Sequence, residues 1–171
     1  MTADQLVTRA RALFLDDDHT YGCAETTFLV LKEAFGLPDA LDTSAAMVLN
    51  GGIAYSGGVC GTLSGAALAA GLLAGQRLAE HRVAKRTARE IVVRLMDDFQ
   101  ASYGAVDCRA LLGREIRTSA QHQVFLDSGI WRDVCMTQIE FVVTRLGALP
   151  GDPIWDQQCA TAELPAGRIP R

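Results

Sequence analysis

The residues best able to do chemistry in this chain are four cysteines that lie far apart in the sequence: Cys23, Cys60, Cys108 and Cys135. Their intervals contain no CxxC pair and no zinc-ribbon spacing, so the spacing alone identifies no metal. Thiolates attack disulfides and bind soft metal ions, and either use requires several sulfur atoms to meet. If the fold gathers the four side chains we expect redox or metal–thiolate chemistry, and otherwise ordinary buried cysteines.

Three of the four cysteines follow residues that are typical of helix starts: Gly22 before Cys23, Gly57 and Gly58 before Cys60, and Asp107 before Cys108. The free N–H groups and partial positive charge at a helix start stabilise a thiolate, so these positions predict lowered thiol pKa values. Cys135 lies on the apolar stripe of the last predicted helix, and we expect it to face the core.

Length and charge limit the class of protein. A chain of 171 residues with 49% hydrophobic residues has material for one domain with one core. The net charge of -4 lacks the basic footprint that binds phosphate backbones, so we expect no nucleic-acid partner. Residues 1–18 lack the basic start and apolar core of a secretory signal, which predicts a cytoplasmic protein. Cysteines in that reducing compartment are not expected to form a standing disulfide framework.

Apolar periodicity predicts an all-α fold, a compact bundle of about five to six helices around a buried helix of small residues. The first helix follows a Thr2–Gln5 capping box, and further helices are expected over 23–35, 44–50, 60–74, 83–103 and 130–146, with a short turn at 108–112. Asp107 and Ser128 are candidate caps. Residues 1–147 form the predicted four-cysteine domain, and residues 148–171, rich in proline, form an irregular C-terminal tail.

The predicted helix 60–74 lies within a stretch, 43–76, that contains no charged residue. Central glycines interrupt this stretch, so neither half offers the roughly 20 apolar residues of a spanning helix, and we expect no membrane insertion. Small residues recur every four positions at Gly57, Gly61, Gly65 and Ala69, which indicates close packing against a helix or a cofactor. Gly58 and Gly61, on either side of Cys60, are the candidate cofactor-binding residues.

The segment Gly57-Gly58-Val59-Cys60-Gly61-Thr62-Leu63-Ser64-Gly65-Ala66 resembles the central motif of the C_GCAxxG_C_C family, small proteins described as redox-active. The other cysteines fall in the family's order: Cys23 is similar to the first, Cys108 to the third and Cys135 to the fourth. The likeness extends from about residue 6 to residue 146. The sequence departs from the family pattern at Thr62, where the motif has alanine, and in the added tail with Cys159.

The resemblance implies a redox site that uses all four cysteines, as a reversible thiol/disulfide site or as ligands of an iron–sulfur cluster, with a role in electron transfer. A related domain accompanies an iron–sulfur centre in split-Soret-type cytochromes. The alternative that the cysteines bind an iron–sulfur cluster comes from this relationship. A thiol-dependent oxidoreductase or an electron carrier would act on a redox partner protein or on a small thiol or disulfide.

Two other hypotheses remain open from the residues alone. One is a non-enzymatic binding or assembly module with structural cysteines, and the other is a structural zinc site. A homodimer would cover the small apolar surface. His19 and Glu25 lie near Cys23 and could carry protons, but an exposed loop histidine and a carboxylate that favours the helix dipole explain them as well. No role is expected for His81 or His122, and Cys159 is expected to be a free thiol.

Overall fold

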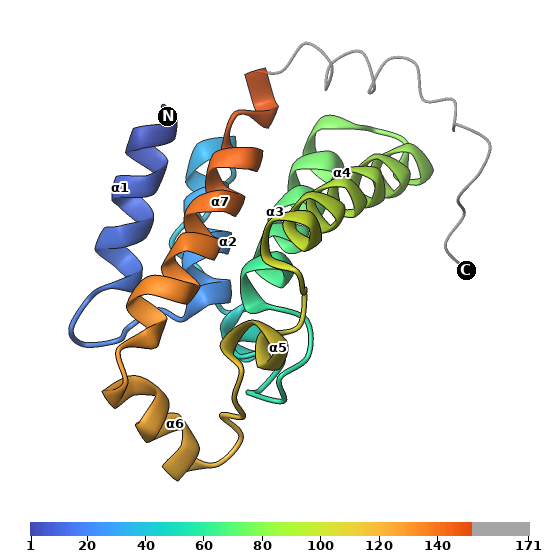
Figure 1. Cartoon of the computed structure of the whole chain (residues 1–171). Helices are drawn as coiled ribbons and strands as arrows, with labels where there is room; N and C mark the ends of the chain where they lie inside the picture. Colours follow the sequence, from blue (N-terminus) through green and yellow to red (C-terminus); the bar gives the residue numbers. More distant parts are fainter. Residues whose placement is uncertain (152–171) are drawn as a thin grey trace.

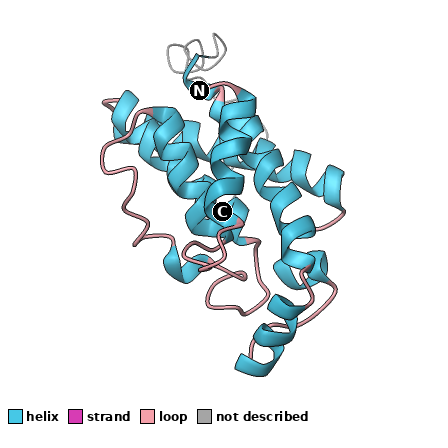
Figure 2. Cartoon of the chain, turned by 90° about the vertical axis from the view of Figure 1, so that its left-hand side faces the viewer, coloured by secondary structure: helices cyan, strands magenta, loops and turns pink. Residues whose placement is uncertain are grey.

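The computed structural model describes residues 1–151 and is entirely helical in that range. The α-helices are α1 (Ala3–Phe14), α2 (Cys23–Phe35), α3 (Gly61–Arg77), α4 (His81–Tyr103), α5 (Cys108–Leu112), α6 (Ser119–Asp127) and α7 (Met136–Gly147). Short helical turns lie at Met47–Leu49 and Leu149–Gly151, and a π-helical turn, Trp131–Cys135, leads into α7. Figure 2 shows helices and loops alone in the described part of the chain. The all-α prediction is confirmed.

The helices form two groups that share one core. α1, α2 and α7 pack against one another, while α3 packs against both α2 and α4 (Figure 1). Alanines and leucines of α3 are buried at the centre, and Ile139, Val142 and Val143 of α7 are inaccessible to solvent. None of the helices within residues 1–151 is both long enough and apolar enough to cross a membrane.

The predicted boundaries of the longer helices agree with the structure to within a few residues. The Thr2–Gln5 capping box is present, and α4 begins two residues early because Glu80 accepts hydrogen bonds from the N–H groups of Arg82 and Val83. The Ser128 hydroxyl accepts from the N–H of Ile130 at 3.4 Å. Asp107 occupies the N-cap position of α5, as predicted, but its side chain makes no capping hydrogen bond.

The predicted helix over 44–50 was also wrong, because only Met47–Leu49 is helical, as a 3-10 turn. The chain instead turns left-handed over 51–55, where every φ lies between 48° and 74°. Gly51 and Gly52 adopt this conformation without cost, but for Ile53 it is unusual since its branched Cβ crowds the backbone. This turn lies beside the start of α2, as described below.

Helix α6 was not predicted. Only Phe125 of its nine residues is buried, so its apolar period is too weak to stand out. The available signal was its capping box, in which the Thr118 hydroxyl accepts from the N–H of Gln121 and the Gln121 side chain accepts from the N–H of Thr118. The predicted tail, including Trp155 and Cys159, falls mostly outside the described residues.

Candidate functional site

The starts of four helical elements meet at one end of the molecule, the lower end in Figure 1. We call this region, made of residues 19–23, 50–61, 106–116 and 119–135, the thiol end. Cys23 is the first residue of α2, Cys60 precedes α3, Cys108 is the first residue of α5, and Cys135 ends the π-helical turn. The sequence therefore placed three of the four cysteines at helix starts correctly.

The four thiols share one neighbourhood. The thiols in each of the six pairs are close enough for charge on one to affect the other. Charge on Cys60 raises the pKa of Cys23, charge on either of these raises the pKa of Cys108, and charge on any of the three raises the pKa of Cys135. All four are free thiols, and residues 1–151 contain no disulfide. Three are buried, with exposed fractions below 10%, and Cys23 is partly exposed. Helix packing thus gathers sulfur atoms that are 27 to 112 residues apart in sequence.

Glycines on α3 allow the start of α2 to approach closely. A Cβ atom on Gly61 would lie 2.6 Å from Cys23 Sγ, and one on Gly65 would overlap the carbonyl oxygen of Ala24. The small-residue row therefore packs against a helix, α2, and the space over Gly61 holds the Cys23 thiol. That Gly58 or Gly61 binds a cofactor stays a prediction. Gly57 has φ of 83° and lies before the helix, so it is not part of the α3 face.

A short antiparallel bridge between Val59 and Asp107 holds Cys60 and Cys108 in register. The N–H of Cys60 donates to the carbonyl of Val106 at 2.8 Å, and the N–H of Cys108 donates to the carbonyl of Gly58 at 2.7 Å. Because each cysteine follows one bridge partner, the bridge brings the starts of α3 and α5 together. This contact joins segments that are almost 50 residues apart and has no short-range signal.

The π-helical turn delivers the fourth thiol. Its wider turn departs from the regular helix predicted over 130–146, and such turns are frequent at functional sites. Trp131 anchors it, since its indole N–H donates to the carbonyl of Leu126 at 3.2 Å and its ring packs edge-on against Phe14. Cys135 faces the core, as predicted.

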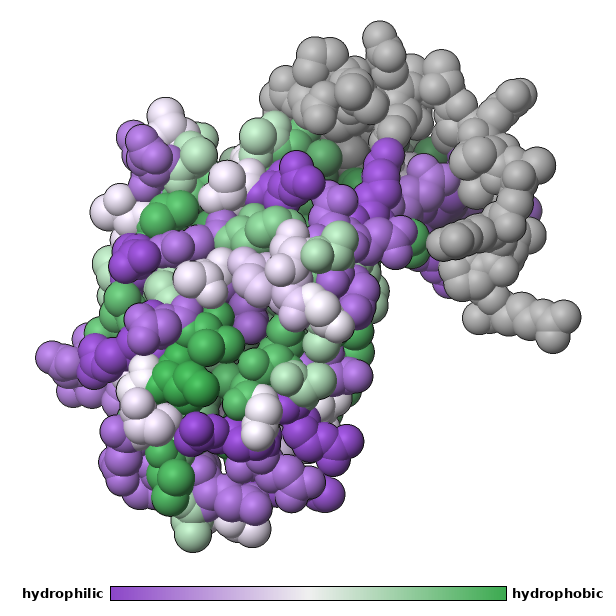
Figure 3. Space-filling model, viewed as in Figure 1, coloured by the Kyte–Doolittle hydropathy of each residue, from purple (hydrophilic) through white to green (hydrophobic). Residues whose placement is uncertain are grey.

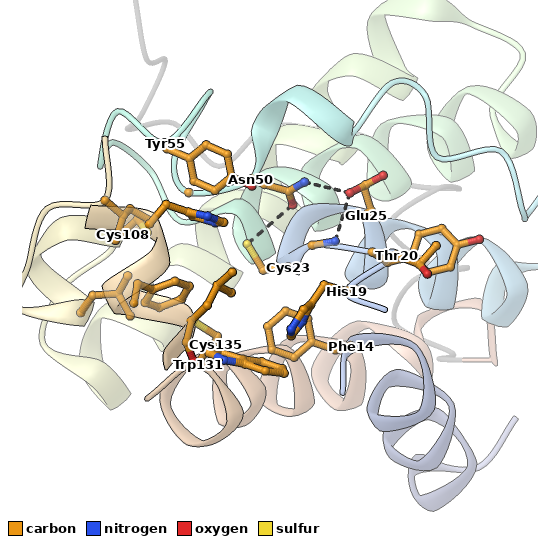
Figure 4. Close-up of a pocket in the computed structure, with 18 residues that line it drawn as sticks. Phe14, His19, Thr20, Cys23, Glu25, Asn50, Tyr55, Cys108, Trp131 and Cys135 are labelled. Atoms are coloured by element: carbon orange, nitrogen blue, oxygen red, sulfur yellow. Dashed lines mark hydrogen bonds between the residues drawn. The ribbon is translucent and has the colours of Figure 1, made fainter. Parts of the chain in front are cut away.

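Cys23, Cys108 and Cys135 line one cavity of about 180 Å³ at the thiol end. Its walls are mainly apolar and aromatic, with Trp131 and Tyr55 among them (Figure 4). Figure 3 shows hydrophobic surface on the lower part of the face in view, bordered by hydrophilic residues. A small molecule that enters this cavity would meet three of the four thiols.

Both histidines near the cavity contact its aromatic walls. His19 is exposed, as expected, yet its ring lies edge-on to Trp131 with 4.9 Å between centroids, and His122 meets Tyr55 at 4.7 Å. Both line the cavity, so a surface position alone does not describe them. His81 begins α4, away from the cavity.

Burial controls the ionisation of the thiols. It raises the pKa of Cys23 and of Cys108 to about 12, and neighbouring thiols add to both shifts. Burial also raises the pKa of Cys60, and raises that of Cys135 well above its ordinary value. An ionised sulfur loses hydration in this apolar site, and a second thiolate nearby is repelled.

The expectation of lowered pKa values was therefore wrong in its net direction. The predicted influence of the helix starts is present but smaller than burial: backbone N–H groups of Gly51, Cys23 and Ala24 lower the pKa of Cys23 in part. N–H groups at the start of α3 act in the same way on Cys60. At neutral pH the resting site holds four protonated thiols.

The sequence reasoning missed Asn50, the only asparagine in the chain. Its amide oxygen accepts from the N–H of Ala24 at 2.9 Å. The same oxygen lies 3.9 Å from Cys23 Sγ, a contact that Figure 4 marks with a dashed line. Its amide nitrogen donates to Glu25 at 2.8 Å. Glu25 therefore holds Asn50 in place, a role that the surface interpretation of Glu25 did not include. An asparagine ten residues before a cysteine-glycine pair carries no recognised signal.

The donor set, four cysteine thiols of which three line one cavity, is chemically suited to an iron–sulfur cluster or to zinc. In residues 1–151, however, no three cysteine, histidine or acidic side chains stand close enough to hold a single metal ion. The arrangement therefore does not fit a mononuclear zinc site.

Residues 21–148 match the family described as "Putative redox-active protein (C_GCAxxG_C_C)". The chain belongs to this family. The matched range contains all four clustered cysteines and every helix from α2 to α7. The chain matches no curated protein and no solved structure. Membership of the C_GCAxxG_C_C family confirms the resemblance drawn from the cysteine order and the glycine-rich centre.

Proposed function

We propose that the four-thiol cluster is the redox centre of this C_GCAxxG_C_C protein and that Cys23 and Cys60 interconvert between a dithiol and a disulfide. The observation that supports this most directly is the mutual proximity of four free thiols, one of which, Cys23, is partly exposed and faces the cavity. Of the three thiols near Cys23, Cys60 is the partner we propose because Cys23 Sγ packs on Gly61, the residue directly after Cys60.

The reaction balances with a disulfide R–S–S–R as oxidant. The Cys23 thiolate attacks one sulfur, which releases one RS⁻ and forms a mixed disulfide. Cys60 then attacks Cys23 in that mixed disulfide and releases the second thiol. Two protein thiols lose two protons and two electrons, and R–S–S–R becomes two RSH. Either a small disulfide or a redox partner protein would satisfy this chemistry.

The high pKa values define the conditions for this chemistry. Because thiolate is the attacking form, the exchange is slow at neutral pH and accelerates as the pH rises toward about 12. A substrate or partner that supplies positive charge in the cavity would lower this barrier.

The test is oxidation of the reduced protein by glutathione disulfide, followed by acid trapping of the free thiols and peptide mass spectrometry. We expect a Cys23–Cys60 disulfide that dithiothreitol reverses, and its loss in Cys23→Ser. Four thiols that stay reduced over the whole glutathione range would contradict the proposal. Leu63→Ala serves as a control for altered packing beside Cys60, with the disulfide retained.

A second candidate is an iron–sulfur centre with Cys23, Cys60, Cys108 and Cys135 as ligands and a role in electron transfer. The specific observation in its favour is that all four thiols are costly to ionise, since iron would replace the protons and offset the charge. Anaerobic reconstitution with iron and sulfide, followed by iron analysis and visible absorption, separates the two candidates. Stoichiometric iron that all four Cys→Ser variants lose would favour the cluster; a colourless protein would favour the dithiol.

A further inference from the structure

We propose that Asn50 is a positioning residue of the thiol centre, whose amide oxygen accepts the hydrogen of the Cys23 thiol and so favours the dithiol over the Cys23–Cys60 disulfide. This inference rests on the proposed thiol/disulfide function. It assigns a role to a residue outside the cysteine motif.

The orientation of the Asn50 amide is fixed by its partners. Nδ2 donates to Glu25 Oε2 at 2.8 Å and to the carbonyl of Met47 at 3.1 Å, and both of these atoms can only accept. The amide oxygen must therefore face the opposite side, where the N–H of Ala24 donates to it at 2.9 Å and Cys23 Sγ lies at 3.9 Å. Asn50 is only 8% exposed, so water does not compete freely for these positions.

Glu25 is itself held on both oxygens. Oε2 also accepts from the N–H of Gly22 at 3.0 Å, and Oε1 accepts from the Thr43 hydroxyl at 3.1 Å. Gly22 is required here because a Cβ atom would overlap the Asn50 side chain. The amide is thus clamped between two loops and the first turn of α2, and its oxygen stays directed at the thiol.

The second thiol of the pair has a similar neighbour. Gln138 Oε1, on α7, lies 3.5 Å from Cys60 Sγ, and Gln138 is 3% exposed. Both thiols of the proposed pair therefore meet a buried amide oxygen. Formation of the disulfide removes both S–H donors and leaves these oxygens without them.

The energetic consequence has a definite sign. In the disulfide form Asn50 Oδ1 keeps the N–H of Ala24 and loses the Cys23 thiol, while Gln138 Oε1 loses the Cys60 thiol. Losing a hydrogen bond to a buried acceptor is unfavourable, and that cost falls on the disulfide form alone. A pair whose reduced form is stabilised in this way is the more oxidising one. Asn50 and Gln138 would then keep the pair reduced until a partner protein or a small disulfide supplies enough oxidising potential.

The experiment titrates the Cys23–Cys60 pair of the full chain with mixtures of reduced and oxidised glutathione. One neutral hydrogen bond is worth about 1 kcal/mol, so Asn50→Ala is expected to oxidise at a ratio roughly fivefold more reducing than the parent chain. Gln138→Leu is expected to shift the ratio in the same direction. Asn50→Asp keeps an oxygen acceptor facing the Cys23 thiol, so it is expected to oxidise no more readily than the parent.

Ile91→Val on α4 is the control, because it loosens a buried site away from the thiols and should lower the melting temperature without moving the ratio. An unchanged or more oxidising midpoint in both Asn50→Ala and Gln138→Leu would overturn the inference. If Asn50→Ala does not fold, Asn50→Asp and Gln138→Leu decide the result between them.

A second readout does not depend on disulfide formation. The S–H stretching band of Cys23, assigned in the Raman spectrum by its loss in Cys23→Ser, is expected to move to higher frequency in Asn50→Ala as the S–H···O contact is lost. A band that stays in place would refute the Asn50 contact even if the disulfide forms. A parent chain that forms no disulfide but shows the band shift would refute the proposed function and leave the contact standing.

Discussion

In the helical body, formed by α1, α4 and α7, large apolar side chains recur at helical spacing and interlock, whereas the thiol end uses glycines, short turns and cysteines. Phe99, Phe141 and Tyr103 stack edge-on or tilted in the body, with ring centroids 4.7 to 6.0 Å apart. At the thiol end, Gly61 and Gly65 let the start of α2 touch the backbone of α3. Burial of apolar area stabilises the body, whereas close backbone contact fixes the positions of the cysteines at the thiol end.

The contrast teaches where the molecule can tolerate change. A body side chain can lose a methyl group and leave a small cavity, but an atom added between two backbones has no room. The thiol end also buries polar atoms, such as those of the Asn50 amide, which need hydrogen-bond partners. Substitutions should therefore be more damaging at the thiol end than in the body, even when they are chemically smaller.

The largest expected effect is on thiol reactivity. If it were not observed, the contrast between the thiol end and the helical body would not hold. Since burial raises the pKa of Cys23 from 9.0 to about 12, its thiolate fraction at pH 7 is about a thousandfold below that of an exposed thiol. Iodoacetamide labelling followed by peptide mass spectrometry should be slow in the native protein and fast in urea. The native rate should rise about tenfold per pH unit. Equal native and unfolded rates at pH 7 would show that the thiol end is open to water.

The next effect concerns stability at high pH. The thiols have folded pKa values above their unfolded value, so they contribute stability that is present below about pH 9 and is lost as the pH rises toward 12. Urea unfolding at a series of pH values should show the free energy of unfolding falling by a few kcal/mol in this window. Cys23→Ala should make the decline shallower, and an identical slope in the variant would contradict the assignment.

The third effect compares alanine substitutions at two glycines of α3, one closely packed and one with open space around it. Gly65→Ala places a Cβ atom against the carbonyl of Ala24 and is expected to destabilise the fold by about 2 kcal/mol. Gly71→Ala meets nothing within 4 Å and is expected to stabilise by up to about 1 kcal/mol, since alanine favours a helix. Denaturant unfolding measures both, and a gain of stability in Gly65→Ala would contradict the close approach of α2 and α3.

The smallest effect belongs to the surface of the body. Arg145 and Asp98 form an ion pair at 2.8 Å between α7 and α4, but both side chains are about half exposed. Solvent screening leaves such pairs worth little, so Arg145→Gln should change the free energy of unfolding by less than about 1 kcal/mol. A larger loss, measured by the same unfolding experiment, would show that the body depends on surface charge as well as on its apolar core.

The sequence alone determined the parts of the molecule that local patterns encode. Apolar periodicity predicted α1, α4 and α7, because each buries one stripe of its own residues, and it also predicted α2, which is buried on most of its surface. The Thr2–Gln5 box and the glycines after α2 and α4 fixed helix ends. The order of the four cysteines and the Gly61–Gly65 spacing were sufficient to indicate the family and a redox site.

Only the tertiary structure decided the chemistry of that site. Three contacts join segments that are distant in the sequence: Cys23 packs on Gly61, Val59 pairs with Asp107, and Asn50 faces Cys23. The local periodicity of the sequence does not predict such contacts. The pKa values show the consequence most clearly. Each helix start favours a thiolate, as the sequence predicts, but burial is a property of the assembled protein, and desolvation outweighs the local N–H groups.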